Sequence, residues 1–156
     1  MPTSDTKTRN SKLETRNSAR TGTVLAFDFG TKRIGVAVGD FETRLAHPLA
    51  VIAGVENRAR FATIGRLVAE WRPAQLLVGF PVHADGTEHP VGKLARRFAQ
   101  RLHGRFGIPT ELVDERLTSR EAEGLLRAAG ARGARLKAGL DPVAAQRILE
   151  AFFEKA

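Results

Sequence analysis

Three acidic residues stand at positions where a carboxylate needs an explanation. Asp28 interrupts an apolar segment just before Gly30 and Thr31, which begin a tight turn. Glu115 comes after the apolar segment at residues 110–113, and Asp141 stands at the start of the last apolar-periodic segment. Carboxylate oxygens select Mg²⁺ or Mn²⁺, and two such ions about 4 Å apart clamp the attacking and leaving oxygens in phosphodiester cleavage. If the three carboxylates converge, the sequence predicts a two-metal site for this chemistry.

Each of these carboxylates also has a purely structural interpretation. Asp28 can hydrogen-bond the turn that follows it, as aspartates at strand ends often do. Glu115 can pair with Arg116 or Arg120. Asp141 precedes a proline and has the form of a helix N-cap, because proline is favoured at the first helical position. The spacing alone leaves both interpretations open for each residue.

The charge of the chain points to a polyanionic partner. The 156 residues include 25 Lys and Arg and 17 Asp and Glu, a net charge of +8. Residues 1–22 carry +3 of it and contain few large aliphatic side chains, so we expect a disordered basic tail there and one folded domain over residues 23–156. Contacts to phosphate oxygens are largely independent of sequence. We expect them from Lys32, Arg33, Arg116, Arg120, Arg132, Arg135 and Lys137, although each can equally be a solvated surface charge.

The first half of the chain has the pattern of a β-meander followed by a helix. Residues 23–29 and 33–40 alternate apolar and small side chains around a short turn and predict a hairpin. A third strand is expected within residues 44–52, where Pro48 indicates an edge or a bulge. Helical spacing then predicts a helix from Glu56 to Trp71. These elements place Asp28 at the end of the first strand.

The second half alternates short apolar strands with helices. Residues 75–79 and 110–113 predict buried parallel strands, and residues 80–90 predict a loop. We expect helices over residues 91–106, with Leu94 on the buried stripe, over residues 118–129, and from Asp141 onward, with a basic loop at residues 131–138. The fold class is therefore α/β, with a three-stranded antiparallel meander and two parallel strands in one mixed sheet flanked by helices. The carboxyl ends of its parallel strands would gather Asp28, Gly79 and Glu115.

Composition excludes several other classes of protein. No apolar stretch approaches the roughly 18–20 residues that span a bilayer. The chain has no cysteine, which excludes disulfides, a thiol nucleophile and Cys-ligated metals. We expect a cytoplasmic protein with no membrane partner. His83 and His89 flank the predicted loop and could assist proton transfer or simply be solvated.

Four motifs in order carry a resemblance to a known family. The segments FDFGTKRIGVAVGD, LLVGFPVHADGTE, VDERLTSREAE and LDPVAAQRILEAFFE resemble the YqgF/RuvX family of Holliday junction resolvases, whose members are also described as pre-16S rRNA nucleases. The resemblance covers residues 23–156 and implies an RNase H-like fold with a metal-dependent nuclease site. It implies that the family's three acidic positions fall on Asp28, Glu115 and Asp141. It also implies a loop beside the site that includes Gly79, Phe80, Pro81, Asp85 and Gly86.

The resemblance favours one function over three alternatives. We expect hydrolysis of RNA phosphodiesters in 5′-end processing of pre-16S rRNA, with Mg²⁺ or Mn²⁺ as cofactor. A Holliday junction resolvase acting on branched DNA is the alternative, as is a non-catalytic nucleic-acid-binding module. Actin-like ATPases and sugar kinases share the Asp-x-Gly-Thr opening but need two such domains, which 156 residues cannot supply. A resolvase generally needs a two-fold dimer, whereas we expect a monomer or a weak homodimer here.

Overall fold

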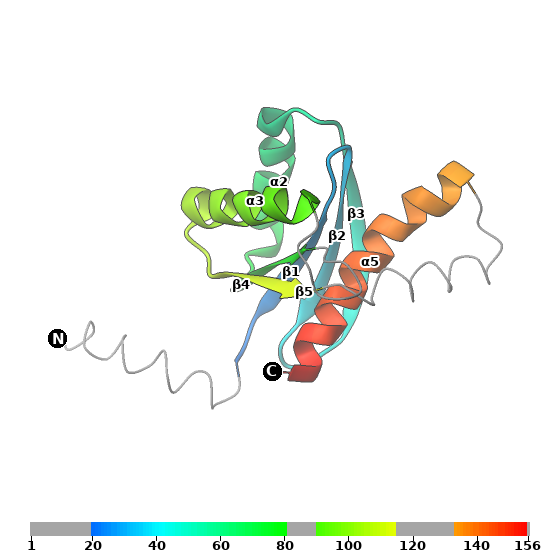
Figure 1. The fold of residues 1–156 in the computed structure, drawn as a ribbon. Coiled ribbons are helices and arrows are strands. Elements are labelled where there is room, and N and C mark those ends of the chain that lie inside the picture. Colours follow the sequence, from blue (N-terminus) through cyan, green and yellow to red (C-terminus); the bar gives the residue numbers. More distant parts are fainter. Residues whose placement is uncertain (1–19, 81–89, 115–132, 156) are drawn as a thin grey trace.

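The computed structural model describes residues 20–80, 90–114 and 133–155; for Pro90 and residues 133–141 it describes the backbone. These residues form one five-stranded sheet with the strand order β3-β2-β1-β4-β5. Figure 1 shows α2 and α3 on one face of the sheet and α5 on the other. The strands are β1 (Thr23–Phe29), β2 (Arg33–Asp40), β3 (Ala46–Ala53), β4 (Gln75–Phe80) and β5 (Thr110–Asp114), and the helices are α2 (Asn57–Trp71), α3 (Pro90–Phe106) and α5 (Gly133–Lys155).

The antiparallel half of the sheet confirms the predicted meander. β1 pairs with β2 from Thr23 opposite Asp40 to Phe29 opposite Ile34. β2 pairs with β3, and the register shifts between Val36 and Ala37, beside Pro48. β3 is the edge strand of the sheet, so Pro48 lies where proline is tolerated, at an edge and next to a bulge.

The parallel half confirms the predicted strand directions. β4 runs parallel to β1, with Asp28 opposite Gly79, and β5 runs parallel to β4, with Asp114 opposite Phe80. β1 is therefore the central strand, and it joins the antiparallel and parallel halves. The carboxyl ends of β1, β4 and β5 lie at one end of the sheet, as expected.

Two hydrophobic cores cover the two faces of the sheet. The core under α2 and α3 contains large side chains, among them Leu25, Phe27, Phe61 and Phe98. The core under α5 contains smaller ones from the strands, among them Val24, Ala26, Ala37 and Ala46, together with residues of α5. Successive residues of β1 alternate between the two cores, as the period of a strand requires. One sheet therefore supports a helical layer on each face, with larger strand side chains under α2 and α3 than under α5.

The last helix begins earlier than the sequence predicts. α5 starts at Gly133, so Asp141 and Pro142 lie inside it, and the predicted N-cap at Asp141 is wrong. Most of the predicted basic loop at residues 131–138 is also helical. Alanine, leucine, lysine and arginine dominate residues 134–140 and are good helix formers. Proline usually breaks a helix because it lacks an N–H donor, but the helix continues through Pro142 to Lys155.

The other helices agree with the prediction except in one side chain. α2 and α3 match their predicted ranges closely. Leu94 was expected on the buried stripe of α3, but it is 40% exposed. The buried stripe of α3 runs through Ala95, Phe98, Ala99 and Leu102 instead. The predicted helix over residues 118–129 lies outside the described residues. No helix in the described ranges is long and apolar enough to cross a membrane.

Candidate functional site

Asp28 lies between two glycines at the carboxyl end of the central strand. In the register of the sheet, it is opposite Gly35 of β2 on one side and Gly79 of β4 on the other. Asp28 is half-buried, and it lies on the α5 face because it continues the alternation of Val24 and Ala26. Neither cross-strand neighbour of Asp28 has a side chain, so none flanks its carboxylate from these two positions. This arrangement suits a carboxylate that must admit a cation or a phosphate.

The end of β5 brings the second predicted acidic motif to the same end of the sheet. Asp114 is the last residue of β5 and pairs with Phe80, the neighbour of Gly79. Glu115, the predicted ligand, follows Asp114 in the chain and lies outside the described residues, as do Arg116 and Arg120. β1 and β5 are separated by one strand, which places their backbones about 10 Å apart. The chain therefore leaves β5 within side-chain reach of the space beside Asp28.

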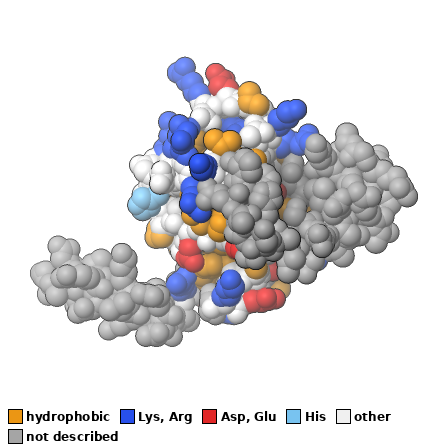
Figure 2. All heavy atoms as spheres, viewed as in Figure 1, with side chains coloured by type: hydrophobic (Ala, Val, Ile, Leu, Met, Phe, Trp, Pro, Cys, Tyr) orange, Lys and Arg blue, Asp and Glu red, His pale blue; other side chains and the backbone are white. Residues whose placement is uncertain are grey.

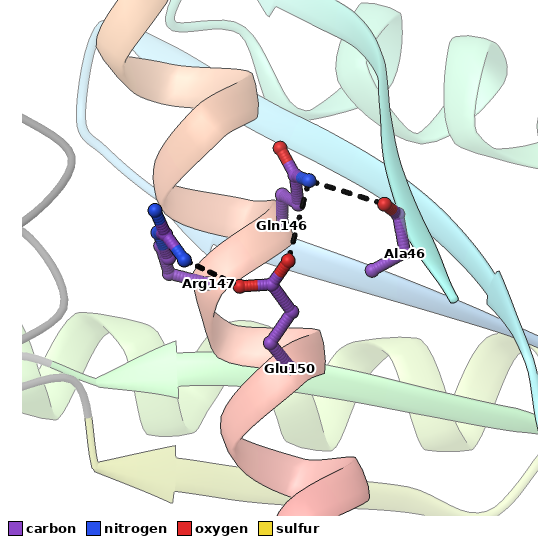
Figure 3. Close-up of polar contacts among 4 residues, drawn as sticks. All are labelled: Ala46, Gln146, Arg147 and Glu150. Carbon is purple, nitrogen blue, oxygen red and sulfur yellow. Dashed lines mark hydrogen bonds and ion pairs between the residues drawn. The ribbon is translucent and has the colours of Figure 1, made fainter. Parts of the chain in front are cut away.

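α5 carries the third predicted carboxylate across the same face of the sheet. The backbone of Asp141 lies inside α5, three and four residues before the buried Ala144 and Ala145. Farther along, the Gln146 side chain donates a hydrogen bond to the carbonyl oxygen of Ala46 on β3 (3.1 Å; Figure 3). α5 is therefore fixed against the meander by its own polar contacts as well as by its apolar side.

The turn after Asp28 is held by a buried arginine that sequence reasoning missed. Arg60 is 3% exposed. Its Nη2 donates to the carbonyl oxygens of Gly30 (2.8 Å) and Thr31 (2.7 Å), and its Nε donates to that of Gly54 (2.8 Å). Its guanidinium carbon also lies 5.6 Å from the centre of the Phe29 ring. Arg60 thereby ties α2 to the turn that carries the predicted site residues.

Burial changes the electrostatics of Arg60 without removing its charge. Desolvation lowers the pKa of its guanidinium, but arginine starts so high that it remains protonated. The sequence contained one indication that Arg60 is buried. Arg60 directly precedes Phe61, on the apolar side of a predicted helix. A single cation there was indistinguishable from a surface charge by pattern alone.

The other predicted residues of the turn have close neighbours. A Cβ on Gly30 would lie 2.5 Å from the carbonyl oxygen of Arg33, so glycine is required there. Thr31 and Lys32 are exposed and Arg33 is half-buried. The carbonyl oxygen of Lys32 accepts a hydrogen bond from the N–H of Gly54 (3.0 Å). The turn is thus fixed by its backbone, which leaves the Thr31 and Lys32 side chains available to a ligand.

Several predicted residues cannot be placed in this site. Pro81, Asp85, Gly86 and the two histidines of the predicted loop lie outside the described residues, as does Arg132. Arg135 and Lys137 belong to helix α5 and not to a loop. Within residues 20–80, 90–114 and 133–155, no group of three acidic, histidine or cysteine side chains that could hold a metal is found. The predicted triad includes Glu115, so its assembly stays a prediction.

Comparison with known proteins identifies close relatives. A family model described as "RuvX: Holliday junction resolvase" matches residues 22–155. A protein of Nitrosomonas europaea named "Putative pre-16S rRNA nuclease" is 52% identical over 137 residues, which cover 88% of this chain and 93% of the relative. A protein of the same name from Neisseria gonorrhoeae is 56% identical over 133 residues, which cover 85% of this chain and 88% of the relative.

Solved structures show the same fold at lower sequence identity. Thermus thermophilus RuvC, in a structure with a Holliday junction substrate, is 18% identical with a TM-score of 0.53, and the match covers 86% of this chain and 94% of RuvC. A second structure of that protein gives a TM-score of 0.51 at 15% identity, over 85% of this chain and 95% of the other. The mixed sheet is thus the RNase H-like fold that the resemblance implied. With its sheet order, its Asp28 turn and its match over residues 22–155, the chain belongs to the RuvX family.

Proposed function

We propose that this protein is a metal-dependent nuclease that hydrolyses phosphodiester bonds of RNA in 5′-end processing of pre-16S rRNA. In this proposal Asp28, Glu115 and Asp141 hold Mg²⁺ or Mn²⁺, and the Gly30–Thr31 turn borders the site. The observation that carries it is the position of Asp28, between Gly35 and Gly79 at the carboxyl end of β1, in a chain whose close relatives are named for this activity.

The course of α5 supports a place for Asp141 near Asp28. A Cβ on Gly39 would meet the Leu149 side chain at 3.2 Å, so Leu149 lies beside Gly39, which pairs with Val24 near the start of β1. Asp141 is eight residues before Leu149, about 12 Å along a helix, and Asp28 is about 13 Å from Val24 along a strand. Figure 1 shows α5 running back against the direction of β1. The backbones of Asp141 and Asp28 are thus expected at a similar height along β1, which supports the proposal that both residues serve one site.

The donor set fits a hard divalent cation. Carboxylate oxygens are the preferred protein ligands of Mg²⁺ and Mn²⁺, and the two cross-strand neighbours of Asp28 are glycines, which place no side chain beside it. When bound, such a cation would lower the pKa of a coordinated water and neutralise charge on the phosphate. The chain's own contribution is positional. Arg60 fixes the backbone of the turn, and the sheet fixes the direction of Asp28.

A Holliday junction resolvase is the second candidate. It is favoured by the description of the matching family model. A resolvase cuts two strands symmetrically and needs a two-fold dimer, whereas the processing of one RNA end needs a single site. Sedimentation of the protein with and without a four-way junction separates the two: a tight dimer making paired nicks in DNA, without RNA cleavage, would exclude the first proposal. We propose a monomer or weak homodimer that acts in the cytoplasm.

The proposed function is tested by a nuclease panel with matched carboxylate variants. Precursor 16S rRNA, an RNA–DNA hybrid and a four-way DNA junction are each incubated with Mg²⁺ or Mn²⁺. We expect Asp28→Asn to lower the rate of RNA cleavage at least about 10³-fold, because charge stabilisation at the reacting phosphate is lost. Unchanged cleavage by this variant would remove Asp28 from the mechanism.

Asp40→Asn is the matched control. Asp40 lies at the opposite end of the hairpin and accepts a hydrogen bond from the N–H of Glu42 at 2.7 Å. An asparagine oxygen can accept the same bond, so this variant makes the same chemical change without touching the candidate site. Its cleavage rate should equal that of the wild type.

A further inference from the structure

Helix α3 concentrates the positive charge of the domain. It contains Lys93 and four arginines but no acidic residue. The remaining residues of 23–156 hold equal numbers of basic and acidic side chains, so α3 accounts for the whole net charge of +5 in that range. The phosphate contacts predicted from the sequence all lie in other segments. Figure 2 shows Lys and Arg side chains gathered over the side of the molecule that α2 and α3 form in Figure 1.

Four of these cations form a row that runs obliquely along the helix. Lys93, Arg97, Arg101 and Arg105 are spaced by four residues on α3 and are all exposed. Residues four apart lie on one side of a helix, about 6 Å apart along its axis. The row thus extends about 18 Å along the axis of α3.

The row borders two adjoining hollows between α3 and the start of α2. One has a volume of about 480 Å³ and is lined by Asn57, Arg58, Phe61, Arg101 and Arg105. The other, of about 230 Å³, is lined by Phe29, Asn57, Leu94, Arg97, Phe98 and Arg101. Asn57 and Arg101 belong to both, so the hollows form one groove, which we call the α2–α3 groove. Its lining contains no acidic residue.

The arginines of the groove are not neutralised by carboxylates. Within the described residues, Arg58, Arg97, Arg101 and Arg105 form no ion pair. By contrast, Arg147 on α5 is paired with Glu150 at 2.7 Å (Figure 3). Arg105 instead lies over the Phe61 ring, 5.0 Å from its centre, which holds its guanidinium at the groove. Arginines without carboxylate partners, beside the aromatic side chains that line the groove, can bind an extended anion.

We propose that the α2–α3 groove binds the sugar–phosphate backbone of the nucleic-acid substrate, outside the cleavage site. This inference rests on the proposed function for the identity of the anion. Phe29 lines the groove and directly follows Asp28, and adjacent residues of a strand face opposite sides of the sheet. A strand held at Asp28 therefore reaches the groove by passing the β1–β2 turn, where Lys32 is exposed. The groove selects polynucleotides by charge and not by base sequence.

The test measures RNA binding without metal, so that it is independent of cleavage. A fluorescein-labelled single-stranded RNA is titrated by anisotropy in EDTA over a series of salt concentrations. For Arg97→Gln/Arg101→Gln we expect Kd to rise about 25-fold at 0.1 M salt. The slope of log K against log[salt] should become less steep by about 1.4, because each phosphate contact on a single strand contributes about 0.7 to its magnitude. Glutamine and arginine have similar helix propensities, so α3 should be retained.

Two further variants decide the interpretation. Arg66→Gln/Arg72→Gln removes the same charge from exposed positions at the far end of α2, outside the groove, and its slope should match the wild type. Arg97→Lys/Arg101→Lys keeps the charge and should bind within about threefold of the wild type. Equal weakening by both glutamine pairs, or no RNA binding by the wild type, would overturn the inference. Asp28→Asn should bind RNA normally, so a failure of cleavage alone counts against the proposed function and leaves the groove intact.

Discussion

The two faces of the sheet differ in both packing and charge. Under α5 the strands present small side chains such as Ala26, Ala37 and Ala46, and Asp28 lies on this face. Under α2 and α3 they present Leu25, Phe27 and Ile34, and the helices carry an unpaired arginine row. Successive side chains of β1 point to opposite faces of the sheet. The carboxylate of Asp28 therefore lies on the α5 face, and the rings of Phe27 and Phe29 lie on the face covered by α2 and α3.

This difference separates two requirements of a nuclease. Carboxylates that hold cations and arginines that hold phosphates would pair with one another if they shared a surface. Pairing would neutralise both sets of charges. Placing the arginine row on one face and Asp28 on the other keeps both sets available at the same end of the sheet.

The largest effect on stability is expected on the α2–α3 face, from Arg60→Met. Methionine keeps much of the apolar contact with Phe29 but donates no hydrogen bond to the carbonyl oxygens of Gly30, Thr31 and Gly54. We expect a loss of about 2–4 kcal/mol in the free energy of unfolding, because an unsatisfied buried acceptor costs about 1–3 kcal/mol. Urea unfolding measures it. A loss below about 0.5 kcal/mol, the usual effect of a surface substitution, would show that the turn does not depend on Arg60.

On the α5 face, Gly39→Ala tests how closely the helix must approach. A Cβ on Gly39 would lie 2.7 Å from the carbonyl oxygen of Leu45 and 3.0 Å from the Phe153 ring. We expect a loss of about 1–3 kcal/mol from overpacking. Gly104→Ala is the control, because a Cβ at that position of α3 meets nothing within 4 Å; it should be neutral or stabilising. Equal unfolding midpoints of the two variants would contradict the close packing of α5.

Metal binding should stabilise the carboxylate face. At Mg²⁺ tenfold above its Kd, the wild type should gain about 1.4 kcal/mol, which raises Tm by about 4 °C for a domain of this size. Asp28→Asn should show no such gain, while Arg97→Gln/Arg101→Gln should gain as much as the wild type. Differential scanning calorimetry with Mg²⁺ and with EDTA measures all three. A Tm that rises equally in Asp28→Asn would place the cation elsewhere.

The smallest effect is expected for the hydrogen bond that joins α5 to β3. Gln146→Ala removes the donor to the carbonyl oxygen of Ala46 and a contact of 3.3 Å to Glu150 (Figure 3). We expect a loss of about 1 kcal/mol, the usual net value of one hydrogen bond. Glu150→Gln serves as the comparison, since the Arg147–Glu150 pair is about one-third exposed and contributes at most about 1 kcal/mol.

Sequence reasoning predicted the strands and the place of Asp28 but mispredicted two helices in part. Alternation and turn residues located β1 to β5 because strand periodicity is local. The prediction was wrong for α5. The Asp141-Pro142 pair matches the pattern of a helix start, but the helix continues through both residues. The prediction also placed Leu94 in the core, because an apolar residue at helical spacing does not show whether a partner lies opposite. Arg60 was missed for the converse reason, since its partners are carbonyl groups far away in the sequence.

Motifs, periodicity and composition were enough to identify the family, the order of the elements and the excess of positive charge, because they are properties of the chain itself. Which residues face one another became known from the folded structure. It placed Gly35 and Gly79 on either side of Asp28, buried Arg60 under the turn, and joined arginines of α2 and α3 around one groove. These relations depend on strand register and helix packing, which bring together residues that are distant in the chain.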